Sequence, residues 1–490
     1  MEMFVVAVLI VVLAHLTLGV ILWLRVRKLY SYPGLLGFPV IGNLYYFYRT
    51  LFLCTMCSMN NYLSKVAEKY GENGLCFHWV YGFRRAVIIT SPHVIKDIGF
   101  HPNLSVKPGF MYGGLYPYMD GPFAATQADE LWKTKRKEHI TCLKKSHVDS
   151  EYFNSFVKSA DKLVDLMLAS PNVDAHHTTI QAINGVTMKT LFGFETNIVE
   201  HPMVTKIMML FVDIASITMA TPKLIGYILA IIRPLDFLVS WEFSKLRKLI
   251  LKMVNNAVMS NPSPLPEPCL SVLITKRNRK NNGSDTTLMN EFQEMFLASA
   301  HTTGSALSNS IICLALQPDM QERAWKEQYE IFGNDKRDPS IDDIQQMQFL
   351  DRLIKECMRF VGPVFLGKLT TGDIDINGIT IPSDTCLVFL MNSMRMDPKY
   401  CNNPNVFDPD RFLEESNTLK YSCSPYGVGV RSCPGVYFST LLMKITFSKI
   451  IRRLKLRPLK KDLRFEDIQF KDSLLREAKI PCALLVEERA

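Results

Sequence analysis

The strongest constraint on this chain is an uncharged apolar run near its start. The run covers Met3–Leu24, 22 residues without a formal charge, and is followed by Arg25, Arg27 and Lys28. About 20 apolar residues let a helix span a bilayer, whereas a cleaved signal peptide would place its cations ahead of a shorter apolar run. Cations directly after the run favour a cytosolic position for the residues that follow. We therefore expect a transmembrane signal anchor at residues 3–24, with the rest of the chain in the cytosol.

A hinge and a large globular part should follow the anchor. Residues 25–43 combine the three cations with Pro33, Gly34 and Pro39, which interrupt regular structure and form a basic, Pro/Gly-containing hinge. The whole chain has 490 residues, and single cores usually stop growing at about 250 to 300. Length alone therefore allows two domains or one unusually large one over residues 44–490.

The overall composition excludes several protein classes. Hydrophobic residues make up 48% of the chain and charged residues 21%, which excludes disordered, collagen-like and disulfide-scaffold proteins. The 12 cysteines have no repeated spacing, as suits a reducing compartment. The net charge of +9 comes without a dense basic run, so we expect no nucleic acid partner and assign the excess to a membrane surface or an acidic partner.

Apolar periodicity makes the chain mainly α-helical, with a smaller β part. Apolar residues recur at helical spacing in five segments, Phe153–Leu168, Val204–Met219, Glu242–Val258, Met289–Leu316 and Ile344–Phe360. Alternating patterns predict strands in Arg85–Thr90 and Asp373–Leu390.

The clearest loops are Ser260–Pro268, which is rich in proline, and the polar run Asn278–Thr287. The apolar segment Leu224–Ile232 is interpreted as a core helix, with insertion into the membrane surface as the alternative.

A glycine-rich loop around Cys433 carries the most specific chemical signal. Gly429, Arg431, Cys433 and Gly435 stand at fixed spacings just before an expected helix that begins near Val436. A helix N-terminus and a nearby guanidinium favour a thiolate, and glycines let a flat ligand approach the backbone. These are the requirements of a thiolate that ligates haem iron. A buried structural cysteine is the alternative interpretation, and it remains the default for the other cysteines.

With this loop, the sequence resembles the cytochrome P-450 haem-thiolate monooxygenases, and the resemblance extends over nearly the whole chain. The family has phenylalanine where this chain has Tyr426. Glu356 and Arg359 match its Glu-x-x-Arg pair, and Arg411 matches the segment that supplies a second arginine. Residues at i and i+3 share a helix face, and one carboxylate can bridge two guanidiniums. The resemblance implies that these three residues are structural, and that Tyr426, Gly429 and Gly435 belong to the cofactor-binding loop.

The resemblance also implies which side chains bind the haem propionates. Trp132 and Arg136 match the helix that donates to a propionate, and Arg431 joins them from the cysteine loop. Lys368 stands where relatives usually have arginine, and Arg395 where they have histidine. Both remain cationic and are expected to contact the cofactor with altered geometry.

The segment Met289–Leu316 resembles the long helix on the oxygen side of the haem. Its centre departs from the family pattern, because Ser299 replaces glycine and His301 replaces an acid, while Thr302 keeps the hydroxyl that directs protons. His301 is either a proton relay or a hydrogen-bonded interior histidine. Ala298 aligns with a position where many fourth-family enzymes carry a glutamate that esterifies the haem, so we expect non-covalent haem b.

Taken together, the resemblance implies a P-450 fold at residues 44–490 behind a single transmembrane helix, with Cys433 as the axial metal ligand. The chain is most similar to the fourth-family clan. We expect an endoplasmic-reticulum enzyme that oxygenates an apolar small molecule such as a fatty acid, sterol, terpenoid or xenobiotic. Electrons would come from an NADPH-dependent flavoprotein reductase, with a b-type cytochrome as a further candidate. A cationic surface suited to this partner is expected from Lys133, Lys135, Lys137, Lys144 and Lys145.

Two other functions stay open at this stage. A haem-thiolate isomerase or dehydratase needs no reductase, and the missing acid before Thr302 is compatible with it. A membrane-anchored haem-binding protein without turnover is the second alternative.

Overall fold

The computed structural model describes residues 56–79, 85–109, 129–170, 172–193, 269–414, 416–472, 475–479 and 483–489, with Gly34, Leu35, Lys248 and scattered positions between Val6 and Ile21. Most of the expected anchor and hinge therefore lies outside the described residues. So do Ser260–Pro268, Leu224–Ile232, Val204–Met219 and, apart from Lys248, Glu242–Val258. Within the part that the structure describes, no helix combines the length and apolar character needed to cross a membrane.

The chain divides into two compact units. Unit 1 comprises residues 1–108, 363–404 and 416–431, and unit 2 comprises residues 109–362, 405–415 and 432–490. Unit 1 contains the larger sheet together with the helix α3 and several shorter helices. Its elements are β1 (Gly34–Leu35), α3 (Met56–Tyr70), β2 (Leu75–Trp79), β3 (Arg85–Ile89), α4 (Pro92–Ile98), η2 (Pro102–Leu104), β5 (Leu366–Leu369), β6 (Ile374–Ile376), β7 (Ile379–Ile381), β8 (Thr385–Phe389), α18 (Met391–Arg395), α19 (Asn417–Ser422) and η9 (Gly429–Arg431).

The sheet of unit 1 has the strand order β1-β2-β3-β8-β5. Strand β3 pairs in parallel with β8 and antiparallel with β2, so it is central. Val87, Ile88 and Ile89 of β3 have no exposed surface, as expected of β-branched residues in a strand covered on both faces. The predicted strand at Arg85–Thr90 is therefore confirmed to within one residue. The segment Asp373–Leu390 forms three strands, since β6 and β7 make a hairpin before β8 begins.

Unit 2 is mainly helical. Its elements are α5 (Glu130–Leu143), α6 (Lys145–His147), η5 (Val148–Tyr152), α7 (Phe153–Leu168), β4 (Val173–Asp174), α8 (Ala175–Thr187), η6 (Met188–Phe192), α12 (Leu270–Lys280), α13 (Asp285–Phe296), η7 (Leu297–His301), α14 (Thr302–Ala315), α15 (Pro318–Phe332), α16 (Ile341–Gln346), α17 (Gln348–Val361), η8 (Pro409–Phe412), α20 (Val436–Arg453), β9 (Leu454–Pro458), η10 (Phe465–Asp467), β10 (Phe470–Asp472), β11 (Arg476–Ala478) and β12 (Ala483–Glu488).

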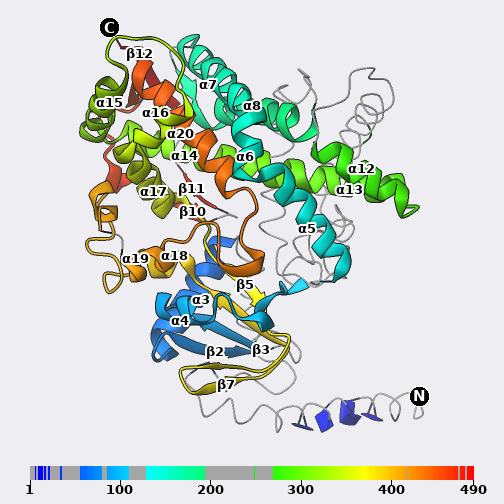
Figure 1. Ribbon diagram of the computed structural model, residues 1–490. Helices are drawn as coiled ribbons and strands as arrows, with labels where there is room; N and C mark the ends of the chain where they lie inside the picture. Colours follow the sequence, from blue (N-terminus) through cyan, green and yellow to red (C-terminus); the bar gives the residue numbers. More distant parts are fainter. Residues whose placement is uncertain are drawn as a thin grey trace. The chain divides into compact units, whose positions relative to one another are not determined.

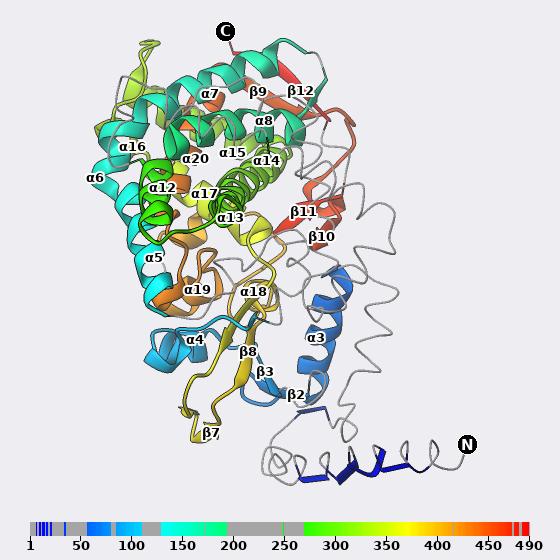
Figure 2. The ribbon, with the colours of Figure 1, turned by 90° about the vertical axis from the view of Figure 1, so that its right-hand side faces the viewer.

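Helix α14 is the centre of unit 2. Every residue from Thr303 to Ala315 is buried, which is typical of a helix enclosed on all sides. Helices α8 and α17 both pack against it, and α7 packs against α8 and α20 (Figures 1 and 2). Strands β4 and β9 pair with β12 in a small antiparallel sheet of the same unit. The predicted fold class, mainly α with a smaller β part, is confirmed.

The segment expected to be helical at Met289–Leu316 is helical, from within α13 to the end of α14, and it contains the π-helical turn η7. Two other predicted boundaries were wrong, each for a local reason. The helix expected at Ile344–Phe360 breaks at Met347, where the Glu327 carboxylate accepts hydrogen bonds from two backbone amides at the start of α17. The loop expected at Asn278–Thr287 shortens to four residues, 281–284, because α12 runs on to Lys280 and Ser284 caps α13.

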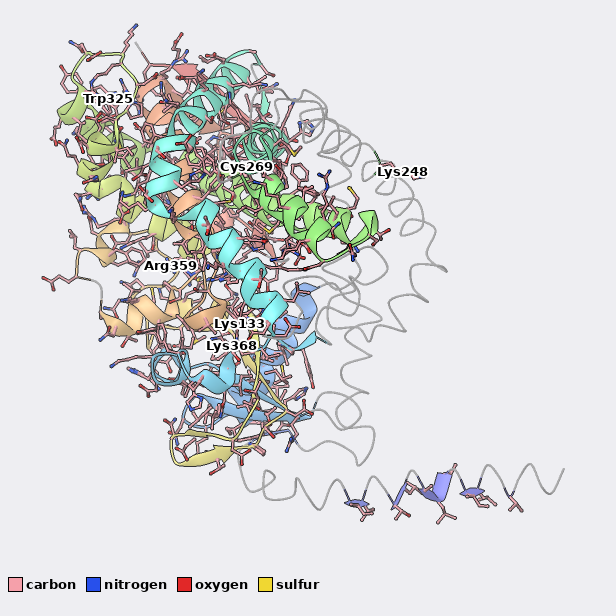
Figure 3. The ribbon with its side chains drawn as sticks, turned by 45° about the vertical axis from the view of Figure 1, so that its right-hand side comes forward. Lys133, Lys248, Cys269, Trp325, Arg359 and Lys368 are labelled. Carbon is pink, nitrogen blue, oxygen red and sulfur yellow. The ribbon has the colours of Figure 1, made fainter. Side chains whose placement is uncertain are left out.

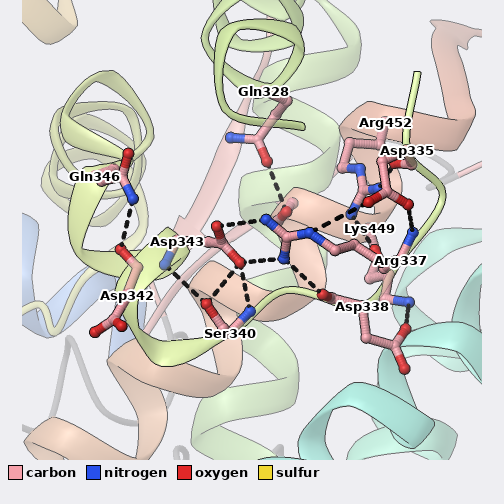
Figure 4. A network of polar contacts seen from close by, with 11 residues as sticks. Gln328, Asp335, Arg337, Asp338, Ser340, Asp342, Asp343, Gln346, Lys449 and Arg452 are labelled. Carbon is pink, nitrogen blue, oxygen red and sulfur yellow. Dashed lines mark hydrogen bonds and ion pairs between the residues drawn. The ribbon is translucent and has the colours of Figure 1, made fainter. Parts of the chain in front are cut away.

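A polar network fastens the connection between α15 and α16 to α20 (Figure 4). Both guanidinium nitrogens Nη1 and Nη2 of Arg337 donate to the Asp343 carboxylate. Asp343 also accepts from the Ser340 amide and hydroxyl, at 2.7 Å in each case. From α20, Arg452 donates to the carbonyls of Asp335 and Arg337. These contacts hold an otherwise irregular connection against a buried helix.

Candidate functional site

Cys433 lies immediately before α20 in unit 2. It is exposed, whereas the other cysteines whose burial the structure describes are buried or partly buried. The residue before it, Ser432, accepts a hydrogen bond of 2.6 Å through its carbonyl from Nη2 of Arg136 on α5. Burial lowers the pKa of Arg136, and the negative charge of a Cys433 thiolate counteracts this. The guanidinium thus fixes the backbone beside the sulfur and favours its anionic form.

The remaining predicted residues of α5 and α20 lie in the same unit. Trp132 is buried on α5, and its amide donates to the Asp129 carboxylate that caps the helix. Gly435 occupies the N-cap position of α20. A methyl group at Gly435 would lie at an ordinary contact distance of 3.8 Å from the Cys433 sulfur.

Unit 1 contains the preceding part of the loop. Gly429 has a positive φ of 76°, and an added Cβ would lie 2.3 Å from the Gly99 carbonyl oxygen. Lys368 donates to that same oxygen at 2.9 Å and to the Val428 carbonyl at 3.0 Å. Only glycine fits this backbone conformation and this close approach. The loop is therefore tied to two distant chain segments by one ammonium group.

The predicted cofactor-binding cations of unit 1 donate mainly to backbone carbonyls. Burial, reinforced by the positive charge of Lys107, lowers the pKa of Lys368 to about 8. Arg431 donates through Nε to the Ser105 carbonyl at 2.6 Å. Arg395 is buried and donates to the Pro363 carbonyl at 2.7 Å. Tyr426, five residues before Arg431 in the sequence, is partly buried.

The chemistry of these residues fits haem. In unit 2, Cys433 would supply a sulfur ligand and Arg136 a cation. In unit 1, considered by itself, Lys368 and Arg431 would supply cations. Lys368 is 7% exposed, and among the described residues its ammonium group donates to the carbonyls of Gly99 and Val428. Burying an ammonium without a carboxylate is costly unless an anion lies near it. A propionate would be such an anion.

The Glu356 carboxylate is bound by two arginines in the interior of unit 2. Arg359 donates to both of its oxygens at 2.8 Å, and Arg411 donates to one of them at 3.2 Å. Glu356 and Arg359 have fully buried side chains, and Arg359 is labelled in Figure 3. The Asp408 amide adds a further hydrogen bond to Glu356 at 2.8 Å. The carboxylate therefore connects α17 to the turn η8.

The centre of the oxygen-side segment lies at the junction of η7 and α14. Thr302 is partly exposed, and its hydroxyl donates to the Ala298 carbonyl at 2.5 Å. His301 is buried, and burial together with the charge of His176 lowers its pKa to about 3. His301 is therefore neutral at pH 7, and its Nδ1 has no hydrogen-bond partner among the described residues. Ala298 carries no carboxylate.

Fewer lysines contribute free positive charge to the expected cationic surface than the sequence analysis predicted. Lys135 is buried on α5 and pairs with Glu291 at 2.7 Å, so its inclusion was wrong. Lys145 pairs with Asp149 at 2.8 Å, and Lys133 (labelled in Figure 3) pairs with Glu130. Lys137 and Lys144 are exposed.

The sequence analysis missed His176 on α8, whose Nδ1 lies 2.8 Å from the Ser308 hydroxyl on α14. One signal was available: His301, Ser305 and Ser308 stand at i, i+4 and i+7, which places polar groups on one face of a helix.

Comparison with known proteins identifies the family. The family model described as Cytochrome P450 matches residues 33–481. Cytochrome P450 4c21 of Blattella germanica is 24% identical over 95% of this chain and 95% of its own length. Probable cytochrome P450 313a3 of Drosophila melanogaster is 23% identical over 92% and 93%, and Cytochrome P450 3A41 of Mus musculus is 25% identical over 87% and 85%.

These matches span nearly the whole chain, and the family they share has a defined chemistry. Its members bind haem b non-covalently with a cysteine thiolate as axial ligand, receive electrons from redox partners, and bind apolar substrates. The chain therefore belongs to the cytochrome P450 family of haem-thiolate monooxygenases.

Proposed function

We propose that this protein is a membrane-anchored monooxygenase of the endoplasmic reticulum that uses Cys433 as its haem ligand and oxygenates an apolar small molecule. The observation that carries the proposal is the exposed thiol before α20, with Arg136 bound to the adjacent carbonyl. Haem, when bound, supplies the activation of dioxygen and the transfer of one oxygen atom. The chain supplies binding, orientation and protons.

Each residue has a distinct part in this proposal. Cys433 holds the iron, while Arg136, Arg431 and Trp132 bind the propionates. Lys368 and Arg395 are proposed as further cofactor-binding cations, and Tyr426, Gly429 and Gly435 shape the loop. The supporting contacts are those of Arg136 with Ser432 and of Lys368 with Gly99 and Val428.

Thr302 is proposed to orient a proton toward the reacting oxygen, with His301 beside it. The Thr302 hydroxyl donates to the Ala298 carbonyl. Its oxygen therefore keeps lone pairs that can accept a hydrogen bond from another group. Glu356, Arg359 and Arg411 act structurally. Their charged groups contact one another, and the side chains of Glu356 and Arg359 have no exposed surface.

The proposals of a membrane anchor and of a reductase partner rest mainly on the sequence. The apolar run Met3–Leu24 and the cations that follow it support an anchor whose catalytic part faces the cytosol. An NADPH-dependent flavoprotein reductase, with a b-type cytochrome as an additional donor, would dock through exposed lysines. Lys137 and Lys144 supply the strongest support for this, since they are exposed on or next to α5.

The test begins with a spin-state screen of the purified holoprotein against fatty acids, sterols and terpenoids. The ligand with the largest spectral response is then incubated with reductase, NADPH and ¹⁸O-labelled dioxygen. The proposal predicts a product containing one ¹⁸O atom, formed only when all components are present. A product formed without NADPH, or one without labelled oxygen, would contradict monooxygenation.

One observation favours a second candidate. The position before Thr302 holds a neutral, buried histidine instead of an acid, and a reductase-independent isomerase or dehydratase has no need of that acid. This candidate predicts turnover of a peroxide-containing substrate without NADPH. Binding of ligands without any turnover would instead indicate a non-catalytic haem protein.

A further inference from the structure

Helix α5 turns polar side chains toward the interior of unit 2 over much of its length. Between Trp132 and Cys142, the buried side chains of this helix are Lys135 and His139. Among the elements that the structure describes, α5 packs chiefly against α12 and the short helix α6. Apolar packing alone therefore gives the middle of α5 little preference for one rotation about its axis.

One guanidinium on α12 joins α5 to α13. Arg277 donates through Nε to both carboxylate oxygens of Glu138 on α5, at 3.0 Å each. Its Nη1 and Nη2 donate to the two oxygens of Glu291 on α13, Nη1 at 3.2 Å. Lys135 on α5 pairs with the same Glu291 carboxylate at 2.7 Å. Helix α12 also packs against both α5 and α13 (Figures 1 and 2).

These four residues form a buried charge cluster in which the charges cancel. The two carboxylates are those of Glu138 and Glu291, and the two cations are Lys135 and Arg277; their side chains are 9% to 14% exposed. Burial lowers the pKa of the neighbouring His139 to about 4, so that ring is neutral at pH 7. Buried ions are tolerated only where each keeps its partner, and a forked guanidinium fixes the positions of the carboxylates that it binds.

The charge cluster sets the direction in which Arg136 leaves α5. Lys135 and Glu138 stand at i and i+3, on one face of the helix. Consecutive helical residues point about 100° apart, so a helix that is fixed at Lys135 is also fixed at Arg136. From this position Nη2 of Arg136 donates to the Ser432 carbonyl at 2.6 Å, beside Cys433. A different rotation of α5 would break that hydrogen bond.

We propose that Glu291, through the buried charge cluster, is a positioning residue that holds Arg136 against the loop of the haem thiolate. The inference rests on the proposed roles of Arg136 and Cys433 in binding the cofactor. Glu291 acts through Arg136 and touches no reacting atom. A carboxylate on α13, outside every motif of the sequence analysis, thereby becomes part of the cofactor site.

The first test is the rate at which the oxidised holoprotein loses haem to an excess of apomyoglobin. Glu291→Gln removes the carboxylate that Lys135 and Arg277 share, and it should accelerate haem loss about fivefold. The reduced protein with carbon monoxide should show less of the red-shifted thiolate band. Glu130→Gln is the matched control on the same helix, because Glu130 pairs with Lys133 at 2.6 Å on the exposed surface. The control should lose haem at the wild-type rate.

The second test asks whether Glu291 acts through Arg136. It compares haem loss in Arg136→Gln with haem loss in the double variant Arg136→Gln with Glu291→Gln. If the cluster serves to position Arg136, the second substitution has little left to disturb, and its fivefold effect should fall below about twofold. If the cluster merely stabilises unit 2, the two effects should multiply.

A milder variant keeps the inference testable if Glu291→Gln does not fold. Lys135→Met leaves Glu291 bound by Arg277, and it should also accelerate haem loss, again only while Arg136 is present. Asp343→Asn removes a carboxylate from the separate network of Figure 4. It should lower stability without changing the rate of haem loss, which separates positioning from stability in general.

Two outcomes would overturn the inference. One is haem loss at the wild-type rate in every folded cluster variant. The other is an effect of Glu291→Gln that is as large without Arg136 as with it. Failure of the proposed function looks different: Arg136→Gln itself would then lose haem at the wild-type rate, or the wild-type protein would lack the thiolate band, and the inference would fall with it.

Discussion

Gly429 is the single residue on which the conformation of the cysteine loop depends most. Its φ of 76° is one that side chains rarely adopt, and an added Cβ would lie 2.3 Å from the Gly99 carbonyl oxygen. The same oxygen accepts a hydrogen bond from Lys368. A side chain at this position would therefore both strain the backbone and separate the lysine from its acceptor.

We predict that Gly429→Ala lowers the midpoint of thermal unfolding and the haem content of the purified protein. Gly378→Ala is the matched control, because Gly378 has a φ of 78° and nothing within 4 Å of an added Cβ. The control should lower the free energy of unfolding only by the backbone strain of a left-handed alanine, about 1–2 kcal/mol. Gly429→Ala should lower it clearly more. Equal losses for the two variants would show that the contact with Gly99 is unimportant.

The buried carboxylate of Glu356 gives a second prediction at the scale of one residue. Glu356→Gln removes the charge that Arg359 and Arg411 share, and an uncompensated buried charge costs about 3–5 kcal/mol. Urea unfolding followed by circular dichroism should show this loss. Lys355→Gln, at an exposed neighbouring position with a 3.6 Å ion pair, should change stability by less than about 1 kcal/mol.

At the scale of elements, local chemistry decides where helices begin and break. The periodicity of Phe153–Leu168 predicted α7 to the residue, because its apolar face is regular and buried. The break at Met347 could not be predicted, since it depends on Glu327 of α15 reaching two amides of α17. The π turn η7 is equally invisible to periodicity, which changes little when one residue is added to a turn.

The Arg337–Asp343 contact gives a pH prediction for the connection between α15 and α16 (Figure 4). Hydrogen bonds from Arg337, followed by those from Ser340, hold the pKa of the Asp343 carboxyl well below its ordinary value. A carboxyl whose pKa is lower in the folded than in the unfolded state stabilises the fold above the unfolded pKa of about 4, and loses this effect as the pH falls below it.

We therefore expect Asp343→Asn to lower the unfolding midpoint at pH 7 and to make less difference at pH 3. Asp342→Asn, at the exposed neighbouring position, serves as the control and should have little effect at either pH. A difference between wild type and Asp343→Asn that is the same at pH 7 and pH 3 would contradict the assigned ion pair.

At the scale of the whole molecule, the family and its cofactor could be predicted from a few motifs in a fixed order. The burial of individual charged residues could not be predicted. The spacing of Gly429, Arg431, Cys433 and Gly435 was enough to indicate haem-thiolate chemistry, because a helix N-terminus and a guanidinium favour a thiolate and glycines let a flat ligand approach the backbone. The burial of Lys135 was invisible, since it depends on Glu291 from α13 lying beside α5.

Electron supply is a property of the whole molecule, and its prediction uses the lysines that remain exposed. Lys137→Glu with Lys144→Glu should slow reduction by the flavoprotein reductase several-fold at low salt, because surface charges act mainly on the rate of encounter. Peroxide-driven turnover should be unaffected. Lys326→Glu, on the exposed surface of α15, is the control, and stopped-flow reduction rates that fall equally in both proteins would contradict a docking surface near α5.

The most direct test of the account is the absorption spectrum of the reduced protein with carbon monoxide. Wild-type protein and Cys423→Ala, which changes a partly buried cysteine of unit 1, should both show the red-shifted Soret band of a thiolate-ligated haem. Cys433→Ala should lose that band. A wild-type spectrum of the histidine-ligated kind, or a red-shifted band that persists in Cys433→Ala, would contradict the assignment of Cys433 as the haem ligand.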